Sequence, residues 1–191
     1  ATSFGLSHIL FARVFSLSEL IIKGKLDSFL VQPKNVLVSV LTSSTDISAI
    51  GDFLYGVVIV CICRPGVGGF FLFLLFAVTG AVIFTSFALL LGSLSFWFVR
   101  MDMVQDQMVM NIVSFATYPD GIFNGVTRFL LYFVIPAGMT VWHPVHMLVR
   151  FEAGMLFTVL GYAGGLTALA VAVFYKGLKR YASGNLMEAR L

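Results

Sequence analysis

Residues 22–35 read IKGKLDSFLVQPKN and form a short polar segment between two strongly apolar regions. The apolar residues that share one helical face in this polar segment are Ile22, Leu26, Phe29 and Leu30. Their i, i+4, i+7, i+8 spacing predicts an amphipathic helix, and Pro33 ends or kinks it because proline lacks a backbone N–H. Such a helix is too short to span a bilayer. We therefore expect a surface helix that lies on the membrane or binds a partner protein, with an ordinary cytoplasmic loop as the alternative.

The composition of the whole chain places it in a membrane. Of its 191 residues, 59% are hydrophobic and 11% are charged, whereas a soluble domain carries roughly 25% charged residues. A surface so poor in charge cannot face water on all sides, so several segments must cross a lipid bilayer. The net charge is only +3, and we expect lipid rather than nucleic acid as the surrounding partner.

The apolar segments predict an all-α, polytopic transmembrane bundle with about four to five spans. The expected spanning segments are residues 1–21 (the inner half of a span), 36–63, 70–99 and 151–174. The segment 36–63 is longer than a bilayer requires, so it must tilt or begin as an interfacial stretch. Residues 100–107 are expected to form a polar break. We expect residues 1–191 to be a single domain that lacks an N-terminal portion.

Residues 108–149 are apolar but interrupted several times. The interruptions are Tyr118-Pro119-Asp120-Gly121, Asn124-Gly125, Pro136 and Trp142-His143-Pro144. Irregular backbone at membrane depth occurs only where protein or water covers it. The pattern therefore predicts one span followed by a re-entrant helix hairpin on the outer side.

Polar residues within these apolar segments are candidates for a translocation pathway. They are Asp46, Asp52, Tyr118 and Asp120. A carboxylate at the bilayer centre costs several kcal/mol and should not face lipid. The alternative, which we favour for Asp46 and Asp52, places them near an interface or in hydrogen bonds between helices.

The sequence has none of the motifs that would make this chain an enzyme. It contains no Gly-x-x-x-x-Gly-Lys-Ser/Thr loop for nucleotide phosphates, and no catalytic triad. Cys61 and Cys63 point about 200° apart on a helix, which excludes a shared metal ion. His143 and His146 have no further ligand at suitable spacing. We expect no catalytic residue, no metal site and no cofactor bound by this chain.

The basic residues predict the orientation of the spans. With Lys23 taken as inside, the inside group also holds Lys25, Lys34, Arg100, Lys176, Lys179, Arg180 and Arg190. The outside group holds Arg64, Arg128 and Arg150. This bias fits the positive-inside rule and rejects the opposite orientation.

Five short pieces of the chain, in order, resemble the permeases of type-2 ATP-binding cassette (ABC) exporters, most closely their uncharacterised bacterial branch. The pieces are Ile22-Lys23-Gly24-Lys25-Leu26-Asp27 with Leu30-Val31-Gln32-Pro33, Ser95-Phe96-Trp97, Tyr118-Pro119 with Ile122-Phe123, Phe133-Val134-Ile135-Pro136-Ala137 with Pro144, and Gly177-Leu178-Lys179-Arg180-Tyr181-Ala182-Ser183. The five pieces are distributed between residues 22 and 183, so the resemblance extends over nearly the whole chain.

The resemblance implies a six-span permease subunit in the bacterial cytoplasmic membrane. Its partners would be a second permease, in a homo- or heterodimer, and ATPase subunits that bind ATP and Mg. The position of the polar segment matches that of the family's coupling helix, which contacts the ATPase. Its ATPase-coupling residues would be Lys23, Lys25, Leu26, Asp27, Phe29, Leu30 and Gln32.

A secondary transporter or channel that needs no ATPase is the alternative function, since broken helices and intramembrane acids also suit that class. The substrate is not named by any motif, although the apolar spans suit an amphiphilic or lipid-like molecule.

Overall fold

The computed structural model describes residues 1–98 and 101–181, and every regular element in these ranges is a helix. In chain order the elements are α1 (Thr2–Phe11), η1 (Ala12–Ser16), α2 (Leu17–Ile22), α3 (Asp27–Leu30), α4 (Val36–Leu41), α5 (Ile50–Cys63), α6 (Gly66–Ser93), η2 (Leu94–Phe96), α7 (Met101–Ala116), η3 (Asp120–Ile122), α8 (Gly125–Phe133), the π-helical η4 (Gly138–Trp142), α9 (His143–Val149) and α10 (Ala153–Leu178). The expected all-α membrane bundle is confirmed.

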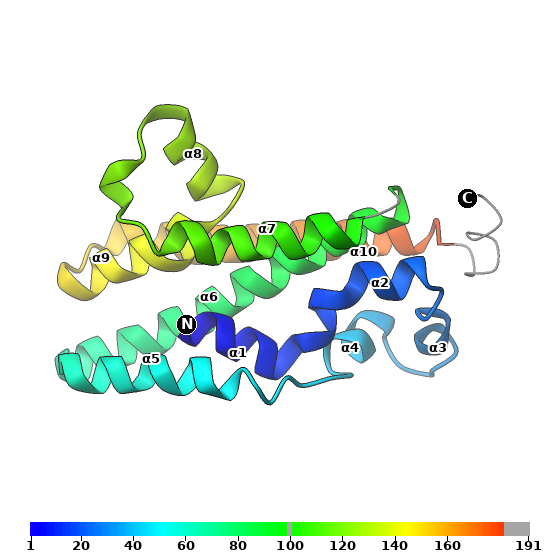
Figure 1. The fold of residues 1–191 in the computed structure, drawn as a ribbon, viewed down its shortest axis with the longest axis horizontal. Helices are drawn as coiled ribbons and strands as arrows, with labels where there is room; N and C mark the ends of the chain where they lie inside the picture. The colour runs from blue at the N-terminus through cyan, green and yellow to red at the C-terminus, as the bar shows by residue number, and fades with distance from the viewer. Residues whose placement is uncertain (99–100, 182–191) are drawn as a thin grey trace.

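Helix α6 is the central element of the bundle (Figure 1), and it packs against α1, α7 and α10. Its 28 residues carry no charge, so the helix can be surrounded by apolar side chains and lipid. Small residues allow the neighbouring helices to approach closely. A Cβ at Gly80 of α6 would collide with Ser3 of α1, and one at Gly56 of α5 would collide with Thr2.

Three helical units in the described residues are long and apolar enough to cross a bilayer: Thr2–Ile22, Gly66–Phe96 and Ala153–Leu178. The pair α8 and η4–α9 passes the same test only when taken together, and it bends by 72°. With 14 residues, α5 is about 21 Å long, which is less than the roughly 30 Å hydrocarbon core. By length and composition the bundle therefore has three spans, or four with the bent pair.

The structure divides the expected span 36–63 into two helices, α4 and α5, with non-helical residues 42–49 between them. A single long tilted helix is therefore wrong, and the alternative with a separate leading stretch holds. The cause is local, because the run Thr42–Thr45 offers hydroxyls that compete with the helical hydrogen bonds. Asp46 then accepts hydrogen bonds from the backbone N–H and the hydroxyl of Ser48, at 2.9 and 2.6 Å.

The polar break expected at residues 100–107 is also wrong from Met101 onward, because α7 runs unbroken from Met101 to Ala116. The polar residues are accommodated because Gln105 is buried in contacts with other helices while Asp106 and Gln107 are exposed. Residues 99–100 and 182–191, which include Arg100, Ser183 and Arg190 of the predictions above, lie outside the described residues.

Different helix termini gather at the two ends of the bundle. Figure 1 shows the α5–α6 turn, α9 and the start of α10 at one end, and α3 with the last turn of α10 at the other. Lys23 follows α2 and Lys179 follows α10, so both belong to the end that carries α3, whereas Arg64 at the α5–α6 turn belongs to the opposite end. The backbone also breaks after α7, where Pro119 is extended, as the sequence predicts.

Candidate coupling and translocation site

The polar segment does not form one continuous helix, and this part of the prediction is wrong. Helix α2 ends at Ile22, a turn follows, and α3 contains only Asp27–Leu30. Gly24 causes the break because its φ of +66° is a left-handed conformation that glycine adopts without the steric cost of a Cβ. The backbone N–H of Leu26 then donates to the carbonyl of Leu20 across the turn, at 3.2 Å.

This turn moves part of the predicted apolar face into the protein. Leu26 is fully buried in a cluster with Leu17, Ile21, Phe96 and Phe174. Phe29 is half-buried against the same cluster, whereas Leu30 is 41% exposed and Val31 is 83% exposed. The exposed residues of the polar segment are Lys23, Lys25, Ser28 and residues 30–35, which include Leu30, Val31 and Gln32. The predicted coupling residues did not include Val31, because it does not lie on the apolar helical face formed by Ile22, Leu26, Phe29 and Leu30.

A hydrogen bond from Tyr175 ties the end of the polar segment to the last turns of α10. Asn35 caps α4, where its Oδ1 accepts from the N–H groups of Leu37 and Val38, and it also accepts from the Tyr175 hydroxyl at 2.8 Å. Burial first, and the neighbouring Asp27 carboxylate second, raise the pKa of Tyr181 above its ordinary value. The polar segment is thus fixed to α10 while its lysines face outward, where Lys23 pairs with Glu19 at 2.7 Å.

Gln105 on α7 joins three parts of the bundle just behind the polar segment. Its Oε1 accepts from the N–H and hydroxyl of Ser18, at 3.2 and 2.6 Å. Its Nε2 donates to the carbonyls of Val14 and Ala88, at 2.7 and 3.0 Å. Gly92 makes room for it, since a Cβ there would lie 3.0 Å from Nε2. Sequence reasoning missed this residue because it assigned residues 100–107 to a polar break, where a glutamine is expected to face water.

A polar hollow of about 290 Å³ lies next to Gln105, between α2 and α7. Its lining includes Glu19, Lys23, Asp102 and Asp106 as well as Gln105. The hollow adjoins the end of α2 from which the polar segment begins, so movement of that segment would change its shape.

The acids proposed for a translocation pathway lie at the ends of helices. Asp46 precedes α5, and the hydrogen bonds from Ser48 lower the pKa of its carboxyl. Asp52 is exposed on the first turn of α5. Both positions suit the interpretation that places these residues near an interface.

Tyr118 and Asp120 hold the outer hairpin to the end of α7. The Trp142 indole N–H donates to the Tyr118 carbonyl at 3.0 Å. One oxygen of Asp120 accepts from Arg128 at 2.6 Å and from the Tyr132 hydroxyl at 3.1 Å. The structure thus brings these two residues together with Arg128, Tyr132 and Trp142, far along the chain from Asp46 and Asp52. Arg128 is the single charged residue within the apolar run 126–141. This signal was used for the orientation of the spans but not to predict a contact with Asp120.

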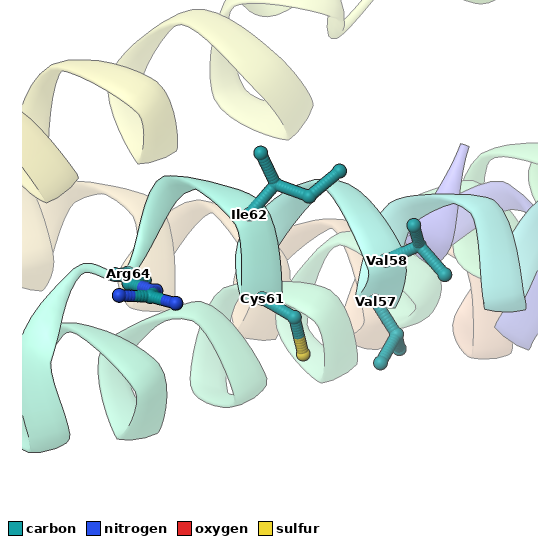
Figure 2. A pocket seen from close by; sticks show the side chains of 5 residues that line it. All are labelled: Val57, Val58, Cys61, Ile62 and Arg64. Carbon is teal, nitrogen blue, oxygen red and sulfur yellow. The ribbon is translucent and has the colours of Figure 1, made fainter.

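A shallow hollow of about 640 Å³ lies on the outward side of α5 (Figure 2). Val57, Val58, Cys61, Ile62 and Arg64 line it. None of these residues was predicted to take part in coupling or translocation, and both Cys61 and Cys63 are free, exposed thiols.

These features define the class of the protein as a multi-pass, all-α membrane protein with a broken helix pair. The family profile described as ABC-2 family transporter protein matches residues 2–184. The chain therefore belongs to the ABC-2 transporter family, and the resemblance found in the sequence is confirmed. Membership makes it a transmembrane permease of an ABC exporter and implies association with an ABC ATPase subunit. Neither the curated proteins nor the solved structures contain a match to the chain.

Proposed function

We propose that this permease is moved by its ATPase partner through the exposed face of the polar segment. The observation that carries this proposal is the double attachment of residues 22–35. Lys23, Lys25, Leu30 and Val31 face outward, whereas Leu26 is anchored in the core and Asn35 is bonded to α10. A force applied to the exposed face would therefore be transmitted to α2 and α10 rather than absorbed by a flexible loop.

The same proposal extends to the nucleotide, the second permease, the membrane and the substrate. ATP and Mg bind to the ATPase subunit, because this chain has no phosphate-binding loop and is itself not catalytic. The chain acts as a single permease domain, pairs with a second permease, and works in the bacterial cytoplasmic membrane. An amphiphilic or lipid-like molecule is the proposed substrate class, since the candidate spans are apolar.

An ATPase-independent secondary transporter is the second candidate function. The 72° bend between α8 and η4–α9 is the observation that favours it, because broken helices bind substrates in many such transporters. Transport by reconstituted permease alone, driven by an ion gradient without ATP, would support this candidate. Transport only with ATP and the ATPase subunit would support the exporter.

Substitution of the two exposed apolar residues of the polar segment tests the main proposal. We expect Leu30→Asp and Val31→Asp together to reduce both co-purification of the ATPase and ATP-driven transport at least about tenfold. Burial of one such side chain is worth roughly 1.5–3 kcal/mol, and 1.4 kcal/mol corresponds to a tenfold change in binding. Leu26 is not used, because it is buried in this chain and an aspartate there would disturb folding.

Val149→Asp is the matched control, since Val149 is 87% exposed on α9, at the other end of the bundle. This variant should retain the ATPase. If the double variant is folded, keeps the ATPase and transports at the normal rate, the polar segment is not the coupling element.

A further inference from the structure

Arg64 occupies a backbone conformation in which glycine is the usual residue. It ends α5 with φ 47° and ψ 59°, and it is the only non-glycine residue with positive φ in residues 1–98 and 101–181. Its N–H donates to the Val60 carbonyl at 3.1 Å, and Pro65 follows. A Cβ is crowded in this left-handed conformation, which is why helices commonly end on glycine there. Arginine at this position therefore carries a steric cost that glycine would avoid.

The guanidinium of Arg64 has no anionic partner on the described part of the chain. The ion pairs there are Lys23 and Lys25 with Glu19, Arg128 with Asp120, and Arg150 with Glu152. Arg64 is exposed at the end of the bundle that lies opposite the polar segment. A positive charge in this position is available to an anion that the protein itself does not supply.

Two apolar hollows meet at this charge. The first, of about 640 Å³, is formed on α5 by Val57, Val58, Cys61 and Ile62 together with Arg64 (Figure 2). The second, of about 560 Å³, lies at the turn between α5 and α6, and its lining includes Cys61, Val67, Phe70 and Phe71 as well as Arg64. Arg64 and Cys61 are common to both hollows, so apolar surface extends from one cation in two directions.

We propose that this site binds an anionic diacyl phospholipid, with its phosphate on Arg64 and its two acyl chains against the two hollows. A guanidinium forms bidentate hydrogen bonds with phosphate oxygens. Attraction of a basic side chain to an anionic lipid surface is favourable by about 1 kcal/mol, which corresponds to about a fivefold preference. A soluble phosphate would satisfy the charge but leave both apolar hollows uncovered. The proposal requires only that the chain lies in a bilayer, and it is independent of the coupling role proposed for residues 22–35.

The two cysteines of the chain allow a direct test by fluorescence. Cys63 is exposed beside the site but lines neither hollow, so a fluorophore attached to it leaves both hollows open. The Cys61→Ala chain, which keeps the wall of both hollows apolar, is labelled at Cys63 and reconstituted in phosphatidylcholine bilayers that contain either brominated phosphatidylglycerol or brominated phosphatidylcholine at equal mole fraction. From the quenching of the fluorophore, we expect the apparent affinity of the site for the anionic lipid to be about fivefold higher than for the zwitterionic lipid.

Three variants show whether Arg64 is responsible. Arg64→Gly should lose the preference without a fall in thermal stability, because glycine suits the backbone conformation better than arginine. Arg64→Lys should keep part of it, as a point charge. Arg150→Gly, which removes another exposed cation, should keep all of it. Equal quenching by both lipids in the parent chain, or an unchanged preference in Arg64→Gly, overturns the proposal. So does complete loss of the preference on addition of millimolar inorganic phosphate, which would show a site for soluble phosphate instead.

Discussion

At the scale of the residue, the Gln105 side chain is buried and takes part in four hydrogen bonds. It is 1% exposed, and both ends of its amide are hydrogen-bonded, to η1, α2 and α6. An apolar residue of similar size would leave the polar groups that now bond to Gln105 buried without this partner. The free energy lost by such an unpaired group exceeds the net contribution of the hydrogen bond itself. The three helical segments are therefore held in one register by a single amide.

We predict that Gln105→Leu destabilises the folded chain by roughly 1–3 kcal/mol, since the carbonyls of Val14 and Ala88 and the Ser18 hydroxyl each lose a buried hydrogen bond. Thermal unfolding in detergent measures this change. Gln107→Leu is the matched control two residues away, because Gln107 is exposed and bonds only to Asn111, at 3.1 Å. Equal effects of the two substitutions would show that the buried network does not stabilise the bundle.

At the scale of the element, the helix hairpin after α7 is held by contacts between its own helices and residues 118–123. Asp120 lies in η3 before α8, with a side chain only 12% exposed, and it pairs with Arg128 of α8. Trp142 of η4 bonds back to the Tyr118 carbonyl and stacks on Phe123, with ring centroids 5.5 Å apart. These contacts explain how a helix pair bent by 72° keeps a defined position.

We predict that Arg128→Ala loosens α8 selectively. Loss of a charged hydrogen bond at a largely buried carboxylate costs about 1–2 kcal/mol, so amide hydrogen exchange in residues 118–133 should become about tenfold faster. Arg150→Ala is the control, because its partner Glu152 lies 3.9 Å away and both side chains are exposed. Unchanged exchange in α8, or the same acceleration throughout the chain, would contradict this role.

At the scale of the whole molecule, the arrangement of the helix ends predicts the topology in the membrane. Lys23→Cys and Lys179→Cys should react with an impermeant thiol reagent from the cytoplasm, and Arg64→Cys should react only from outside. Each substitution is made in a chain without Cys61 and Cys63, and labelling is measured on intact and opened cells. Labelling of position 64 from the cytoplasm would reject the topology.

The candidate site could be predicted only in part, and particular residues show the reason. Residues 22–35 were singled out because their charge interrupts an apolar sequence, and their coupling role stays a prediction. Leu26 was placed on a docking face by its spacing, yet it is fully buried. Helical periodicity reports which residues share a face, but it does not report which other segment covers that face. Gly24 decides the outcome, since one left-handed residue turns the chain and directs Leu26 inward.

The sequence by itself determined the membrane class, the uninterrupted α6 and the break after α7. Each of these depends on local chemistry: the scarcity of charge, the length of an apolar run, and a proline that cannot continue a helix. Only the tertiary structure decided that Gln105 is an internal hydrogen-bonding residue, that Asp120 pairs with Arg128, and that Arg64 stands alone beside two apolar hollows. The physical reason is that the role of a polar side chain depends on which groups it hydrogen-bonds or pairs with. Those of Gln105 lie up to 91 positions away in the chain, and only packing brings them together.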